Sequence, residues 1–290
     1  MRILLLSLGF LWLWPAAPAQ ERVQWFADAR FGMFIHFGLY SIPAGVWEGE
    51  IMGRNMYAEW IQKQGNWPFG ISDAEYQALA AQFNPTAFDA DAWVREAKLA
   101  GMEYLVITAK HHDGFALWPS EVSDFDIVDA TPFKRDLLGE LKAACDRHGL
   151  RLGFYYSHWL DWEHPGGARP PAEDFHSEPR PIQPTEAAFQ QYWEEKCLPQ
   201  VEELMTRYQP DLMWFDTWRE STHLTEARVD ELIALVRRLD PRCLVNSRIN
   251  AGDPAIGDKV DFLSMGDNSF PDELIVKPWE TSATMNKSWG

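Results

Sequence analysis

Six apolar, strand-like segments, each ending in a polar side chain, constrain the fold of this chain more than any other feature of its sequence. They lie at 31–38, 104–112, 152–158, 212–216, 243–248 and 262–267. Helical patterns at 72–81, 89–100, 134–148, 186–208 and 225–239 alternate with them, and Pro199 is expected to kink the longest of these helices. Such an alternation of strands and helices predicts an α/β fold with a parallel sheet.

The polar residues at the strand ends favour one α/β architecture in particular. No Gly-rich phosphate loop is evident, and several strand ends carry polar side chains together, which is typical of a (β/α)8 barrel rather than a doubly wound sheet. Residues 40–70 and 159–185 are expected to form long loops over that rim. Six or seven strands are visible where a barrel needs eight, so we expect a barrel that is incomplete at its C-terminus.

Composition excludes some classes of partner. The chain has 43 acidic and 26 basic residues and a net charge of -17, which disfavours nucleic acid and anionic membrane surfaces as partners. With 46% hydrophobic residues among 290, it is able to bury one large core. Three widely spaced cysteines, Cys145, Cys197 and Cys243, imply neither a disulfide framework nor a metal knuckle.

The first 19 residues have the pattern of a secretory signal peptide. Arg2 precedes an apolar run at 3–14, and Ala17-Pro18-Ala19 matches a cleavage site, so a mature domain is expected to span 20–290. An uncleaved anchor is the alternative, but the run is short for a bilayer span. The sequence therefore predicts a secreted or periplasmic protein.

Asp216 is the strongest catalytic candidate. It closes an apolar segment and lies among aromatic residues, as expected of a carboxylate that attacks a sugar, whose C–H faces pack on aromatic rings. Arg248, at a later strand end, is expected to keep it ionised. The alternative is a structural Asp that caps the next helix. Retaining glycoside hydrolysis also needs a carboxylic acid about 5 Å away, for which Asp267 and Glu280 are the candidates.

Several motifs occur together and in order along the chain. They are Trp25-Phe26, FGMFIHFG at 31–38, Glu59-Trp60, Phe83-Asn84-Pro85, AKHHDGF at 109–115, Tyr155-Tyr156-Ser157, Trp214-Phe215-Asp216, Asn246-Ser247-Arg248 and Trp279-Glu280-Thr281. In these motifs the chain resembles the α-L-fucosidases of glycoside hydrolase family 29. The resemblance implies a barrel that hydrolyses terminal α-L-fucosyl residues of glycans with retention, without a metal or another cofactor. It also implies a C-terminal β-sandwich, which this sequence does not contain.

The resemblance also assigns roles to residues. It places Asp216 as the nucleophile and His36, His111 and His112 on the hydroxyls of the sugar, although strand alternation allows that one of the two adjacent histidines only packs. It places Glu59, Trp60, Tyr156 and Trp214 around the sugar. Many relatives carry their acid where Asp267 stands, and a Glu at the position of Gly266 is also common. We therefore favour Asp267 narrowly as the acid/base, with Glu280 in a supporting role.

Two other functions remain open from the sequence. A sugar-binding module without catalytic activity fits the same residues, because a missing strand would leave an open sheet edge. A metal-dependent barrel hydrolase would use His36, His111, His112 and Asp216 as ligands, but the sequence lacks the H-x-H and H-E-x-x-H spacings of such sites. The linkage, the aglycone and the oligomeric state are not predicted.

Overall fold

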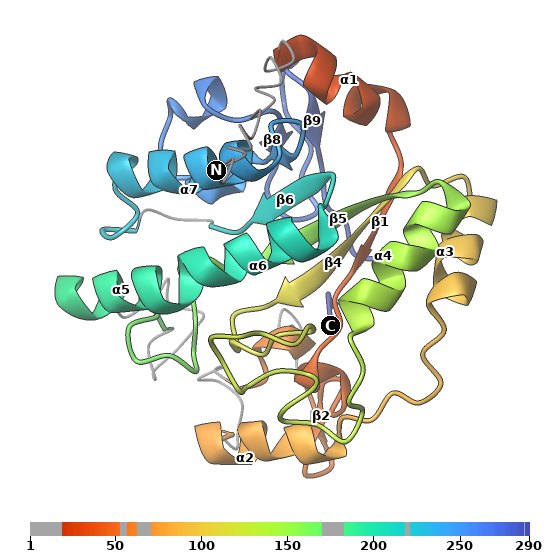
Figure 1. Ribbon diagram of the computed structural model, residues 1–290, viewed down its shortest axis with the longest axis vertical. Helices are drawn as coiled ribbons and strands as arrows, with labels where there is room; N and C mark the ends of the chain where they lie inside the picture. The colour runs from red at the N-terminus through yellow and green to blue at the C-terminus, as the bar shows by residue number, and fades with distance from the viewer. Residues whose placement is uncertain (1–18, 53–56, 63–70, 170–182, 218–220, 287) are drawn as a thin grey trace, which may run out of the picture.

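The computed structural model describes residues 19–52, 57–62, 71–169, 183–217, 221–286 and 288–290 (Figure 1). The predicted signal peptide, apart from Ala19, lies outside these residues, as do parts of both predicted loops. Among the described helices, none is both long and apolar enough to cross a membrane.

A parallel sheet forms the centre of the fold. Its strands pair in chain order: β1 (Gly32–Ile35), β4 (Tyr104–Lys110), β5 (Arg151–Tyr156), β6 (Leu212–Phe215) and β7 (Leu244–Val245). A parallel bridge from Asn246 to Phe262 leads on to β8 (Leu263–Ser264), which pairs in parallel with β9 (Trp279–Glu280). The predicted α/β class with a parallel sheet is confirmed, and the carboxyl ends of all these strands lie at one edge. Within the described residues, no pairing joins β9 back to β1.

Four helices pack beside one another in the order of the strands that they connect. They are α3 (Ala90–Leu99), α4 (Leu137–His148), α6 (Leu198–Tyr208) and α7 (Glu226–Leu239), and each contacts the next (Figure 1). Asp89, Asp136 and Thr225 accept a backbone N–H at the start of α3, α4 and α7, which explains where these helices begin. Gly149, with a φ of 65°, ends α4 in the left-handed conformation that favours glycine.

Where the sequence predicts a kink, the long helix contains a π-helical turn. The helix consists of α5 (Glu186–Tyr192), a π-helical turn over Trp193–Cys197, and α6. Pro199 lies in the first turn of α6, where its missing N–H costs little, and the wide turn lies just before it.

The pleat of the strands divides the apolar core into two parts. Leu105, Ile107, Leu152 and Phe154 belong to the larger cluster, in which the sheet packs against the helices. The alternate residues Val106, Tyr155, Leu212, Trp214 and Leu244 form a second cluster with Phe26 of α1 (Ala19–Ala29). Every other side chain of the central strands is therefore directed to the face away from α3, α4, α6 and α7.

Short elements follow the carboxyl ends of the strands. They are the 3₁₀ turns η1 (Leu39–Ser41), η2 (Ala58–Trp60), η6 (Ser247–Ile249) and η7 (Ile256–Asp258), and the hairpin of β2 (Val46–Trp47) and β3 (Glu50–Ile51). Helix α2 (Asp73–Ala78), with the 3₁₀ turn η3 (Leu79–Gln82), completes the described elements.

Candidate active site

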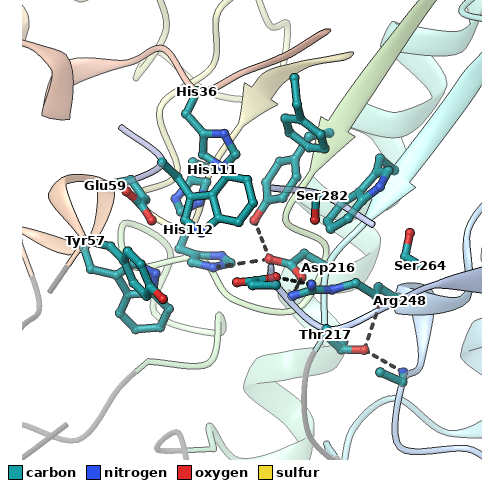
Figure 2. Close-up of a pocket in the computed structure, with 18 of the residues that line it drawn as sticks. His36, Tyr57, Glu59, His111, His112, Asp216, Thr217, Arg248, Ser264 and Ser282 are labelled. Atoms are coloured by element: carbon teal, nitrogen blue, oxygen red, sulfur yellow. Dashed lines mark hydrogen bonds and ion pairs between the residues drawn. The ribbon is translucent and has the colours of Figure 1, made fainter. Parts of the chain in front are cut away.

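A cavity of about 470 Å³ lies at the carboxyl edge of the sheet (Figure 2). It gathers nine of the side chains that the sequence singled out: His36, Glu59, Trp60, His111, His112, Trp214, Asp216, Arg248 and Asp267. Seven of them lie at or just beyond the ends of strands far apart in the sequence, which parallel pairing brings together, whereas Glu59 and Trp60 lie on η2. Five residues that are not among the predicted site residues also line it: Phe34, Tyr57, Tyr155, Thr217 and Trp289.

Asp216 directly follows β6 and is held by two partners. Nη2 of Arg248 lies 2.6 Å from its Oδ1, and the hydroxyl of Tyr155 donates a hydrogen bond of 2.8 Å to its Oδ2. Nε2 of His112 lies 3.7 Å from Oδ2. Only 7% of Asp216 is exposed, so its carboxylate is fixed at the floor of the cavity.

Arg248 joins Asp216 to Asp267. While its Nη2 pairs with Asp216, its Nη1 donates a hydrogen bond of 2.5 Å to Oδ1 of Asp267. The guanidinium also lies over the ring of Trp214, 5.0 Å from the centroid. Burial opposes its charge, but the two carboxylates outweigh burial and raise the pKa of Arg248 above its usual value.

The three predicted histidines are neutral and lie against one another. Burial is the largest cause that lowers their pKa values, and it brings the pKa of His36 to about 3. The ring of His111 stacks on Tyr155, and the ring centroids of His111 and His112 are 4.1 Å apart. Neutral imidazoles both donate and accept hydrogen bonds, which suits the hydroxyls of a sugar.

Ser157 fixes the tautomer of His112. The hydroxyl of Ser157 donates to the carbonyl of Leu160 at 2.8 Å, and the same oxygen lies 2.7 Å from Nδ1 of His112. Since the single proton of Ser157 is used, Nδ1 must be the donor of that contact. Neutral His112 therefore carries its proton on Nδ1 and directs an unprotonated Nε2 towards Asp216.

Both members of the His111-His112 pair line the cavity, contrary to the alternative in which one only packs. That alternative assumed that the strand continues through both residues. β4 ends at Lys110, so the alternation of side chains ends there as well.

Tyr156 is a correction to the predicted site. It points to the helical side of the sheet, where its hydroxyl donates to Gln200 at 2.9 Å, and it is absent from the cavity lining. Its neighbour Tyr155 is the residue that faces the cavity. Trp214 pairs with Tyr155 across β5 and β6 and lines the same cavity, and this register is the signal that identifies Tyr155.

Glu280 lies behind the cavity lining rather than in it. Its carboxylate accepts hydrogen bonds from Nε1 of Trp214 and from the hydroxyl of Ser264, the latter at 2.6 Å. Burial raises its pKa, whereas these two hydrogen bonds act in the opposite direction. Trp279, the residue before Glu280, is 37% exposed. Glu280 therefore orients Trp214.

Glu59, on η2, is the most deeply buried carboxyl group of the cavity, with 2% exposed. The backbone N–H of Gly290 donates to it at 2.9 Å, and Ser288 lies beside it. Burial is the largest cause that raises the pKa of Glu59 to about 7. It is therefore a second candidate for a proton donor, in addition to its predicted place around the sugar.

Among the residues that the structure describes, no group of three or more His, Cys, Asp or Glu side chains is arranged to hold a metal ion. The histidines instead contact Ser157, Tyr155 and one another.

Comparison with known proteins relates the chain to one family. The sequence profile described as Alpha-L-fucosidase matches residues 9–290. The chain is 34% identical to the tissue alpha-L-fucosidase and 30% identical to the plasma alpha-L-fucosidase of Homo sapiens, over 96% of its own length in both cases. It spans 57% of the length of each of these relatives.

Solved structures resemble the fold as well. AlfC, an alpha-L-fucosidase from Lactobacillus casei solved in complex with its alpha-L-fucose product, is 40% identical with a TM-score of 0.76, covering 93% of this chain and 81% of that one. The alpha-L-fucosidase from Vibrio sp. strain EJY3 is 36% identical with a TM-score of 0.77, covering 93% of this chain and 45% of that one.

Proposed function

This chain belongs to the alpha-L-fucosidase family, and we propose that it is a retaining exo-glycosidase that releases terminal α-L-fucosyl residues from glycans. The observation that carries the proposal is the contact of Arg248 with two carboxylates at one cavity. Oxygens held by the two terminal nitrogens of one guanidinium lie within a few ångströms of each other. This is compatible with the spacing of about 5 Å between the carboxyl groups of retaining enzymes.

In the first step, Asp216 attacks the anomeric carbon of fucose and the bond from that carbon to the aglycone oxygen breaks. Asp267 donates its proton to the departing oxygen, which leaves as an alcohol. Asp216 suits the attack because Arg248 and Tyr155 fix both of its oxygens. Asp267 suits proton transfer because its side chain is 38% exposed at the cavity, whereas that of Asp216 is 9% exposed.

In the second step, the Asp267 carboxylate takes a proton from water, the resulting hydroxide attacks the anomeric carbon, and Asp216 departs as a carboxylate. The two steps invert the anomeric centre twice and so retain its configuration.

Side chains around the carboxylates would bind the sugar. Neutral His36, His111 and His112 exchange hydrogen bonds with its hydroxyls, and Trp214, held by Glu280, lines the cavity beside them. Trp60 packs against His112, with ring centroids 5.1 Å apart, and completes the wall of the cavity.

We also propose that the sheet belongs to a (β/α)8-type barrel. Seven parallel strands follow one another from β1 to β9 through the Asn246–Phe262 bridge, and the helices that connect them pack side by side in the same order. The N-terminal pattern at 1–19 supports secretion or export to a periplasm as a further proposal.

A fucose-binding protein without turnover is the alternative, since the same cavity would bind the sugar. The deciding assay is hydrolysis of 4-nitrophenyl α-L-fucopyranoside, with the matching β-D-glucoside as the control and with a chelator in parallel. We expect release of nitrophenol from the fucoside alone, unchanged by the chelator. Binding of fucose without release would favour the alternative, and equal rates on both glycosides would contradict the proposed sugar.

A further inference from the structure

Thr217 ties the turn that carries Arg248 to the end of β6. Its hydroxyl donates a hydrogen bond of 2.8 Å to the backbone carbonyl of Arg248 and accepts one of 2.8 Å from the backbone N–H of Ala251 (Figure 2). Thr217 is completely buried and directly follows Asp216. One side chain thus connects the backbone beside one carboxylate to the backbone of its cationic partner.

Other contacts hold the ends of this turn. The side chain of Asn246 bonds both the N–H and the carbonyl of Phe215, at 2.9 and 3.0 Å. Nε2 of His158 lies 2.9 Å from the carbonyl of Ile249. The Thr217 contact differs from these because it meets the peptide of Arg248 itself, so a change there acts on the position of the guanidinium most directly.

We propose that Thr217 is a positioning residue for the reaction, which acts by fixing Arg248 where its guanidinium reaches both Asp216 and Asp267. The inference rests on the proposed function. Arg248 contacts the two carboxylates at 2.6 and 2.5 Å, so a small shift of its backbone separates at least one of the pairs. Displacements of about 1 Å in such groups lower rates by roughly a hundredfold.

Threonine offers two matched substitutions. Thr217→Val keeps the shape and the methyl group but removes the hydroxyl, which leaves a buried carbonyl and a buried N–H without that partner. Thr217→Ser keeps the hydroxyl and removes only a methyl group. A role in positioning therefore predicts loss of activity for the first variant and its preservation for the second.

A double-mutant cycle with Arg248 separates positioning from a general structural role. The full chain is assayed on 4-nitrophenyl α-L-fucopyranoside as wild type, Thr217→Val, Thr217→Ser, Arg248→Met and the double variant that combines Thr217→Val with Arg248→Met. We expect Thr217→Val to lower kcat/KM by about tenfold to a hundredfold, mainly through kcat, and Thr217→Ser to stay within about threefold of wild type. With Arg248→Met present, Thr217→Val should change the rate by less than about twofold.

The proposal would be overturned if Thr217→Val lowered kcat/KM by the same factor with and without Arg248→Met, or if it did not lower kcat/KM in the wild-type background. If Arg248→Met is too slow to assay, Arg248→Lys takes its place in the cycle. Thr217→Ala replaces Thr217→Val if the latter does not fold, and unfolding of both alongside a folded Thr217→Ser would assign the hydroxyl to fold stability and overturn it too. Failure of the proposed function would appear differently, as a wild-type protein that does not cleave the fucoside.

Discussion

Nη2 of Arg248 lies 2.6 Å from Oδ1 of Asp216. Both side chains are 9% exposed, so this ion pair is shielded from water and depends little on salt. The second terminal nitrogen of Arg248 contacts Asp267, so the pair also sets the distance between the two carboxylates on which the proposed mechanism depends.

The adjacent tyrosines give a matched test of which face of β5 serves the reaction. Tyr155→Phe removes the hydrogen bond to Oδ2 of Asp216, and we expect kcat/KM to fall by about tenfold or more, since a hydrogen bond to a charged group contributes about 1.5–3 kcal/mol. Tyr156→Phe removes the bond to Gln200 on the helical side of the sheet, away from the cavity lining, so it should leave kcat/KM near wild type. Steady-state kinetics of the two variants decide this, and a larger loss for Tyr156→Phe would contradict the geometry.

The raised pKa of Glu59 predicts that the free energy of unfolding depends on pH. Its pKa is raised to about 7 in the folded protein from an ordinary 4.5, so between these values the folded state holds a proton that the unfolded chain has released. Stability from this group is present below about pH 4.5 and is lost as the pH rises towards 7. Relative to Glu59→Gln, wild type should lose at most roughly 3 kcal/mol across that window.

Urea unfolding at several pH values measures this difference. Glu96→Gln, at a largely exposed position, is the control and should follow wild type at every pH. A constant difference between wild type and Glu59→Gln over the whole range would contradict the raised pKa of Glu59.

The leaving group identifies the acid. Loss of the true acid should severely slow the hydrolysis of an unactivated disaccharide. It should have little effect on the hydrolysis of an aryl fucoside, because the nitrophenol oxygen that departs needs little protonation. We expect this pattern for Asp267→Ala, with 4-nitrophenyl α-L-fucopyranoside compared against Fucα(1,6)GlcNAc, a ligand solved in a variant of AlfC. Glu280→Ala should impair both substrates alike, because Glu280 orients Trp214.

Glu59→Gln completes that set of variants. If it shows the dependence on the leaving group and Asp267→Ala does not, the proton comes from Glu59, in keeping with its raised pKa. The assignment of Asp267 would then be wrong, while the role of Asp216 would stand.

The strand ends made much of the site predictable. Asp216, Arg248 and Asp267 lie just beyond apolar strands, and parallel pairing necessarily brings such residues to one edge. Which face of the sheet each strand side chain occupies was less predictable. Tyr155 and Tyr156 are chemically alike, and only their register against Trp214 on β6 shows which one faces the cavity.

Contacts between distant loops could not be predicted from the sequence. The raised pKa of Glu59 depends on burial to which the segment at 288–290 contributes, more than 200 residues away. Likewise, the hydrogen bond from Thr217 to Arg248 depends on the backbone path of a 3₁₀ turn. This turn is too short to show a periodic pattern of hydrophobic residues in the sequence.

The central claim is that Asp216 is the nucleophile of a double displacement, and azide rescue of Asp216→Gly tests it most directly. The variant removes the attacking oxygen and leaves space for azide, so 4-nitrophenyl α-L-fucopyranoside should be hydrolysed at less than about a hundredth of the wild-type rate. Added azide should restore nitrophenol release and give β-L-fucosyl azide, with inverted configuration, as identified by NMR. A variant that keeps more than about a hundredth of the activity, or that forms no fucosyl azide while remaining folded, would contradict this role for Asp216.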